Sequence, residues 1–138
     1  MTAPQVFSLA NPLALVGWLL LIFVPRMRWA SAIVRALPLV LAALYLVLLV
    51  LHWGESKGSF NSLDGVAALF SNQWVLLAGW IHYLAFDLFI GTWEVRDAEG
   101  RGIRHWMVIP CLLLTFLFGP VGLLLYFGLR TAVSTNRK

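Results

Sequence analysis

The chain has 138 residues, of which 61% are apolar and only 12% are charged. A water-exposed domain of this size cannot bury so many apolar side chains, so the composition excludes an ordinary soluble protein. The net charge of +4 would suit a nucleic-acid-binding protein, but the basic residues lie between or beyond the apolar stretches. In that position they are typical of membrane-topology signals. The sequence therefore predicts that the protein associates with the lipid bilayer and does not bind nucleic acid.

Four apolar stretches are long enough to cross a bilayer, which takes about 20 helical residues. The first, second and fourth contain no Asp, Glu, Lys or Arg. They predict an all-α polytopic membrane protein in which residues 1–138 form one transmembrane domain, a four-helix bundle with spans at 6–24, 36–53, 74–93 and 106–129.

The segments around the spans bear on targeting. Residues 1–7 contain no Lys or Arg, and the first span ends at Pro25 and Arg26, which favours a mature span over a cleaved signal peptide. No Arg- and Ser-rich transit segment precedes the span, which favours a bacterial plasma membrane. In the Gly- and Ser-rich loop after the second span, a helix is expected to start near Ser62 or Asp64.

The basic residues predict an orientation. Four helices would place six of them on one side of the membrane, namely Arg26, Arg28, Arg35, Arg96, Arg101 and Arg104. Lys57, Arg130, Arg137 and Lys138 would lie on the other side. The positive-inside rule then makes the first side cytoplasmic and puts both termini outside, although the three basic tail residues argue the other way.

The third span carries the most informative polar residues. An ionisable side chain at bilayer depth is costly and usually faces protein or water. At helical spacing, Gln73, Trp80, Asp87 and Glu94 recur every seven positions and form one stripe, which Tyr83 joins.

Two other groups are candidates to meet Asp87. His82 lies about 140° from Asp87 around the helix, so the two can flank one cleft. Arg104 and His105 begin the fourth span at the end nearer Asp87, and the long Arg104 side chain could reach down to it, although the sequence leaves open whether the two pair. Asp87 is then a structural group in a buried ion pair or hydrogen bond, a catalytic or ligand-binding carboxyl group, or a lipid-facing residue. His82 is either an interhelical hydrogen-bonding group or a ligand-binding one.

The fourth span contains features that bend a helix. Pro110 and Pro120 remove backbone hydrogen bonds, and Gly119, Gly122 and Gly128 allow close approach. They indicate either dense helix packing or a bent wall along a hydrophobic cavity. Cys111 is alone, and no single helix carries a metal-binding motif, so no metal or cofactor is predicted.

Five ordered motifs lie in the second half of the chain, namely Trp80-Ile81-His82, Asp87-Leu88-Phe89, Arg104-His105, Cys111-Leu112-Leu113 and Gly119-Pro120-Val121-Gly122. Together they resemble the ABA4-like family of membrane proteins. Plant members of this family are linked to neoxanthin synthesis, in which a xanthophyll epoxide opens to an allenic alcohol. The resemblance implies a carotenoid ligand and a cofactor-independent isomerisation by acid–base catalysis.

Side-chain chemistry suggests roles within that reaction. Protonated Asp87 and neutral His82 would act as acid and base, or the reverse, and Tyr83, Arg104 or His105 would orient or tune them. The polyene would be held by residues on the third and fourth spans, namely Trp80, Phe86, Phe89, Pro120 and Gly122. Two alternatives stay open: a non-catalytic carotenoid- or quinone-binding subunit, as a homo-oligomer or within a membrane complex, and a proton or ion pathway.

Overall fold

The computed structural model describes residues 1–55 and 57–135, and every regular element in this part of the chain is a helix. This confirms the predicted all-α class. In chain order the elements are α1 (Ala3–Phe23), α2 (Arg28–His52), the short 3₁₀ helix η1 (Trp53–Glu55), α3 (Leu63–Phe70), α4 (Gln73–Gly100), α5 (His105–Phe118) and α6 (Pro120–Thr135).

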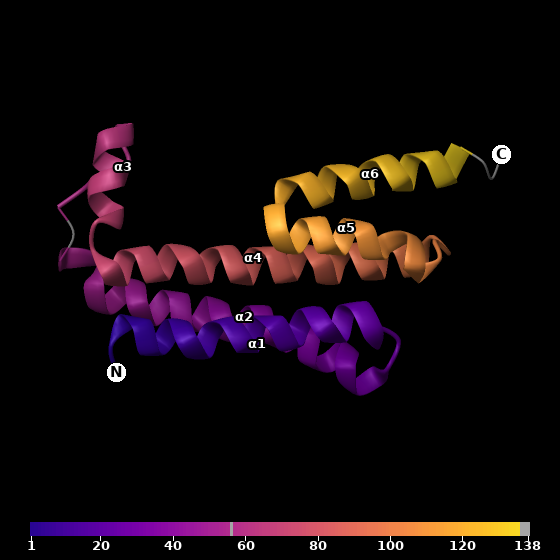
Figure 1. Ribbon diagram of the computed structural model, residues 1–138, viewed down its shortest axis with the longest axis horizontal. Helices are drawn as coiled ribbons and strands as arrows, with labels where there is room; N and C mark the ends of the chain where they lie inside the picture. Colours follow the sequence, from indigo (N-terminus) through magenta and orange to yellow (C-terminus); the bar gives the residue numbers. More distant parts are fainter. Residues whose placement is uncertain (56, 136–138) are drawn as a thin grey trace.

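Three helices are long enough to cross a membrane, and they correspond to the first three predicted spans. With 21, 25 and 28 residues, α1, α2 and α4 extend about 31, about 37 and about 42 Å. They lie side by side (Figure 1). Ser62 caps α3 as expected, because its hydroxyl oxygen accepts a hydrogen bond of 3.0 Å from the Gly65 amide.

Helix α4 continues well beyond the predicted span end at residue 93. The charged segment that follows is helical as far as Gly100, because Val95 and Ala98 are buried in the bundle. The helix then ends in a Schellman motif. The Ile103 amide donates to the Ala98 carbonyl over 2.8 Å, and Gly102 takes a positive φ of 63° between them.

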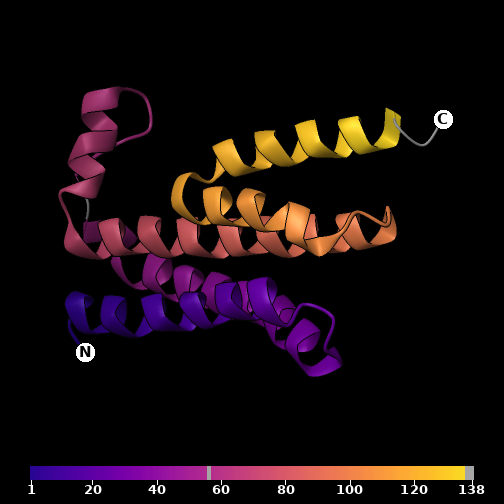
Figure 2. The ribbon, with the colours of Figure 1, turned by 45° about the vertical axis from the view of Figure 1, so that its right-hand side comes forward.

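The predicted fourth span is wrong, because it consists of two shorter antiparallel helices. Helices α5 and α6 have 14 and 16 residues and meet at Gly119, where φ is +45°. Pro120 has no amide hydrogen to continue α5, and glycine adopts the positive φ without a steric penalty. Figures 1 and 2 show α6 running back beside α5. We call this pair the α5–α6 hairpin and Gly119-Pro120 its tip.

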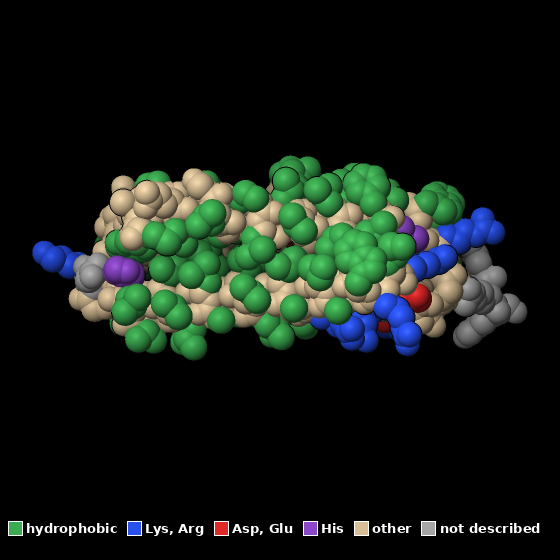
Figure 3. Space-filling model, turned by 90° about the horizontal axis from the view of Figure 1, so that it is seen from below, with side chains coloured by type: hydrophobic (Ala, Val, Ile, Leu, Met, Phe, Trp, Pro, Cys, Tyr) green, Lys and Arg blue, Asp and Glu red, His purple; other side chains and the backbone are tan. Residues whose placement is uncertain are grey.

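The outer surface of the bundle is apolar, as expected for a protein in lipid. Leu39, Val50 and Leu124 are each more than 70% exposed, and Figure 3 shows hydrophobic side chains over most of one face. The interior is built on close helix contacts. A Cβ at Gly91 would lie 2.7 Å from the Trp18 ring, so this glycine lets α1 pack against α4.

The hairpin corrects the predicted distribution of charge. Because α6 returns toward the end at which α4 finishes, Arg130 lies at the same end as the six arginines of the first group, rather than opposite them. Figure 3 shows Lys and Arg side chains gathered at that end. Lys57 lies in the loop at the other end, and Arg137 and Lys138 are outside the described residues. For Arg130, the structure thus removes the conflict with the positive-inside rule.

A charged cluster attaches α6 to α4 at this basic end. Asp97 accepts hydrogen bonds of 2.7 Å from both the Tyr126 hydroxyl and Arg101 Nε. Arg130 approaches the same carboxylate at 3.7 Å from α6. This carboxylate therefore joins two helices near the membrane surface.

Candidate functional site

The polar stripe of α4 faces the α5–α6 hairpin. The Tyr83 hydroxyl donates to the Phe116 carbonyl over 3.1 Å, near the end of α5. Asp87, one turn further along, lies against Gly119. Glu94, two turns beyond Asp87, contacts Thr115 on α5. The part of the predicted stripe that holds Tyr83, Asp87 and Glu94 is therefore the surface on which the hairpin packs, whereas Gln73 and Trp80 face α1.

Asp87 lies at the hairpin tip. A Cβ built on Gly119 would be 3.0 Å from Asp87 Oδ1, a tight contact, and the φ of +45° also favours glycine there. The other Asp87 oxygen, Oδ2, is buried and has no hydrogen-bond partner among the described residues. Gly119 directly precedes α6, and the start of a helix is the positive end of its dipole, which favours a nearby carboxyl group. A buried polar atom without a partner is a marker of functional sites.

Glu94 was not predicted as a site residue, yet it is the most deeply buried acidic side chain that the structure describes. It is 0% exposed and accepts a hydrogen bond of 3.0 Å from the Thr115 hydroxyl through Oε1, whereas its buried Oε2 has no partner among the described residues. Its seven-residue spacing from Asp87 was the signal for this position. The predicted span end at residue 93 left it outside the membrane helix.

Replacing Thr115 by valine tests the contact with Glu94. We expect Thr115→Val to lower the free energy of unfolding by about 2 kcal/mol, because the buried carboxylate loses its hydrogen-bond donor while the volume barely changes. Thr92→Val is the matched control, since the buried Thr92 hydroxyl donates only to backbone carbonyls of Leu88 and Val34. Denaturant unfolding in detergent micelles measures both variants. Equal losses would show that the Glu94 contact contributes nothing specific.

His82 does not share a cleft with Asp87. Its side chain is exposed, and its ring lies 5.5 Å from the Tyr45 ring on α2 and 4.7 Å from the Phe86 ring. Because the hairpin covers a different face of α4, the angle of about 140° between His82 and Asp87 places them in separate surroundings. The structure thus gives His82 no contact with the hairpin-facing carboxyl group.

Arg104 and His105 also lie away from Asp87. Helix α4 extends 13 residues past Asp87, a rise of about 20 Å, which no arginine side chain spans. Arg104 is exposed at the basic end, so it does not pair with Asp87. His105 Nε2 instead lies 2.9 Å from the Ile22 carbonyl and ties α5 to the end of α1.

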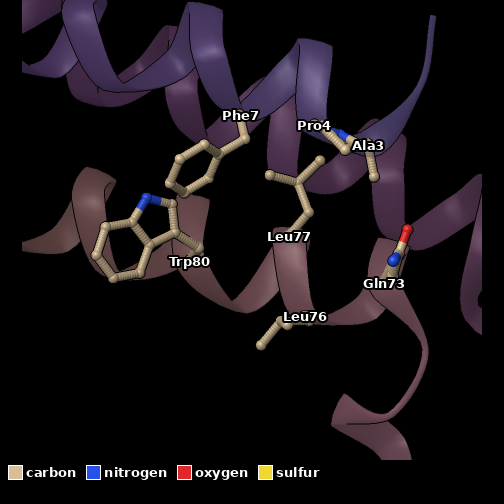
Figure 4. A pocket seen from close by; sticks show the side chains of 7 residues that line it. All are labelled: Ala3, Pro4, Phe7, Gln73, Leu76, Leu77 and Trp80. Carbon is tan, nitrogen blue, oxygen red and sulfur yellow. The ribbon is translucent and has the colours of Figure 1, made fainter.

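An apolar groove lies beside the polar stripe, between α1 and α4. It has a volume of about 390 Å³ and is lined by Ala3, Pro4, Phe7, Gln73, Leu76, Leu77 and Trp80 (Figure 4). The Trp80 indole donates a hydrogen bond of 2.8 Å to Asn11 Oδ1, which holds the ring at one end of the groove. The Trp80 and Tyr83 ring centroids are 5.3 Å apart. Tyr83 and Asp87 follow further along α4, outside the lining of the groove.

The other residues predicted to bind substrate are dispersed. Phe86 and Phe89 are 58% and 57% exposed, and Phe89 lines a different groove between α2 and α4. Pro120 is exposed at the hairpin tip. Gly122 lies against Thr115 of α5, and its lack of a side chain lets α6 pack closely on α5. Trp80 alone among these five lines the α1–α4 groove. Within the described residues, no three His, Cys, Asp or Glu side chains lie together as a metal site.

Three helices of membrane-spanning length and a short apolar hairpin, with carboxyl groups buried between them, define a polytopic integral membrane protein. Residues 5–126 match the family model described as ABA DEFICIENT 4-like, so the chain belongs to the ABA4-like family. This confirms the predicted resemblance and extends it over most of the chain, including the first two spans.

One curated relative is the Protein ABA DEFICIENT 4, chloroplastic, of Arabidopsis thaliana. It is 28% identical to this chain over 148 aligned positions, which include 99% of this chain and 65% of the relative. The chain thus spans slightly less than two thirds of that protein. Because the relative is chloroplastic, the comparison gives no support to the predicted bacterial plasma membrane. No solved structure matches the chain.

Proposed function

We propose that this protein is a membrane enzyme that isomerises a carotenoid epoxide without a cofactor, with Asp87 as its acid–base group. Membership of the ABA4-like family supports the carotenoid substrate. The observation that carries the catalytic part is the buried Oδ2 of Asp87, which has no hydrogen-bond partner among the described residues and lies beside Tyr83 at the hairpin tip. Glu94 also has one such oxygen, but a hydrogen bond from Thr115 ties it to α5, and it lies seven residues further than Asp87 from the α1–α4 groove.

One carboxyl group can perform both proton transfers of such a reaction. The protonated oxygen donates its proton to the epoxide oxygen as the carbon–oxygen bond breaks. The other oxygen accepts the proton that the adjacent polyene carbon loses as the allene forms. The carboxyl group ends in its starting protonation state, and the substrate keeps all its atoms and electrons, so no redox partner is required.

The surroundings of Asp87 suit this task. Gly119 and the start of α6 hold the carboxyl group from one side, while the Tyr83 hydroxyl is fixed by its bond to the Phe116 carbonyl. The α1–α4 groove would hold one end of the apolar polyene against Phe7 and Trp80. Such positioning places the reacting bond within reach of a group that need not move. His82, Arg104 and His105 have no part in this proposal.

Replacing the carboxyl group by an amide tests the proposal. In a host that accumulates an epoxide carotenoid, wild-type protein should convert it to an isomer of unchanged mass, measured by chromatography. Asp87→Asn should lower the initial rate at least about 100-fold, because an amide cannot exchange the proton. The exposed Asp64→Asn at the start of α3 is the control and should retain activity.

A carotenoid- or quinone-binding subunit is the second candidate, and the hydrogen-bonded Trp80 in an apolar groove favours it, because that groove needs no carboxyl group to hold a ligand. The two candidates differ in what purified protein carries. The protein would be a binding subunit rather than an enzyme if it holds pigment that it never converts. In that case the Asp87→Asn variant should still bind the pigment, and the Trp80→Ala variant should not. Conversion at the wild-type rate by Asp87→Asn would reject Asp87 as the acid.

A further inference from the structure

A second groove lies between α2 and α4 at the basic end of the molecule. It has a volume of about 540 Å³ and differs from the α1–α4 groove because arginines line it. Arg35 contributes from α2 and Arg96 from α4, while Leu39 and Phe89 lie deeper along the same two helices. The groove is therefore cationic toward the membrane surface and apolar toward the membrane interior.

The two arginines lack carboxylate partners. Within the described residues, neither Arg35 nor Arg96 forms an ion pair, and Arg35 Nε bonds only the Ser31 carbonyl, at 2.9 Å. Asp97 also lines the groove, but it already accepts from Tyr126 and Arg101 and faces Arg130. Two guanidinium groups thus remain without a compensating anion at the membrane interface.

We propose that this groove binds one anionic glycerophospholipid, with its phosphate between Arg35 and Arg96 and an acyl chain along Leu39 and Phe89. Guanidinium groups match phosphate oxygens in geometry and charge. Basic pockets between membrane helices on the positively charged side are known sites for anionic headgroups. A lipid fits better than free phosphate, because the floor of the groove is apolar and exposed to the acyl region: Leu39 is 71% exposed and Phe89 57%.

Native mass spectrometry of the purified full chain, mixed with phosphatidylglycerol or phosphatidylcholine, tests this site. We expect one tightly retained phosphatidylglycerol and no retained phosphatidylcholine. Arg35→Gln with Arg96→Gln should weaken phosphatidylglycerol binding about tenfold. Arg26→Gln with Arg28→Gln removes the same charge at the same end but outside the groove, so it should leave binding unchanged.

A third variant tests the apolar part while all charges remain. Leu39→Trp places a large ring in the groove at an exposed position and should displace the acyl chain, lowering phosphatidylglycerol retention as strongly as loss of the arginines. The proposed site would be overturned if the two arginine double variants lost phosphatidylglycerol binding equally. It would also be overturned if Leu39→Trp retained phosphatidylglycerol fully. Displacement of the lipid by soluble glycerol phosphate at equal concentration would likewise overturn the assignment to a lipid.

Discussion

Cysteines introduced at Gly100 and Ala132 should react with a membrane-impermeant maleimide from the same side of a sealed vesicle, and one at Asn61 only from the other side. Gly100 ends α4, Ala132 lies near the end of α6, and Asn61 is in the loop before α3, and all three positions are exposed. The α5–α6 hairpin enters and leaves at one end of the bundle, so positions 100 and 132 share a compartment (Figure 1).

The labelling is done in a Cys111→Ser background, so that the introduced cysteine is the one thiol in the chain. Cys111 is 1% exposed in α5, and serine has nearly the same size. The effect is all or none, since a maleimide that cannot cross the bilayer modifies only one side. Labelling of position 132 together with position 61 would mean a continuous fourth span and would contradict the hairpin. The positive-inside rule further predicts that positions 100 and 132 lie on the cytoplasmic side.

Gly122→Ala should strongly destabilise the protein. A Cβ at position 122 would meet the Thr115 backbone nitrogen and hydroxyl at a distance no real contact reaches, so α6 must move away from α5. Forced overpacking of this kind costs about 3 kcal/mol of unfolding free energy. The loss should exceed that of Thr115→Val, because a helix backbone must shift. Thermal or denaturant unfolding in micelles measures it.

Gly128→Ala is the matched control on the same helix. Nothing lies within 4 Å of a Cβ at position 128, and alanine favours a helix over glycine by about 1 kcal/mol, so this variant should be unchanged or slightly more stable. Opposite signs for the two glycines are the expected result. Similar small changes in both would show that α5 and α6 do not pack as closely as Gly122 requires.

The hairpin also links stability to the proposed site. Gly119 touches Asp87 and Thr115 donates to Glu94, so the contacts that hold the hairpin closed are the ones that surround the buried carboxyl groups. A loosened hairpin should therefore expose Asp87 to lipid or water. Under the proposed function, Gly122→Ala would then lose conversion as well as stability, whereas Gly128→Ala would keep both.

The sequence alone determined the membrane class, the first three spans and the polar stripe of α4. Each follows from local composition or from helical spacing: a run of apolar residues must be helical in lipid, because only a helix satisfies its own backbone groups there. The seven-residue recurrence of Asp87 and Glu94 places both on one face, whichever neighbour covers that face. The cap at Ser62 is equally local.

Only the tertiary structure decided where the fourth stretch turns and what meets Asp87. Pro12, Pro38 and Pro110 all lie inside helices, so proline by itself does not mark the break. The turn forms at Gly119-Pro120 because a positive φ there lets Gly122 pack on Thr115, a contact between helices that no local pattern contains. That fold places the hairpin tip, rather than Arg104 or His82, against the Asp87 carboxyl group.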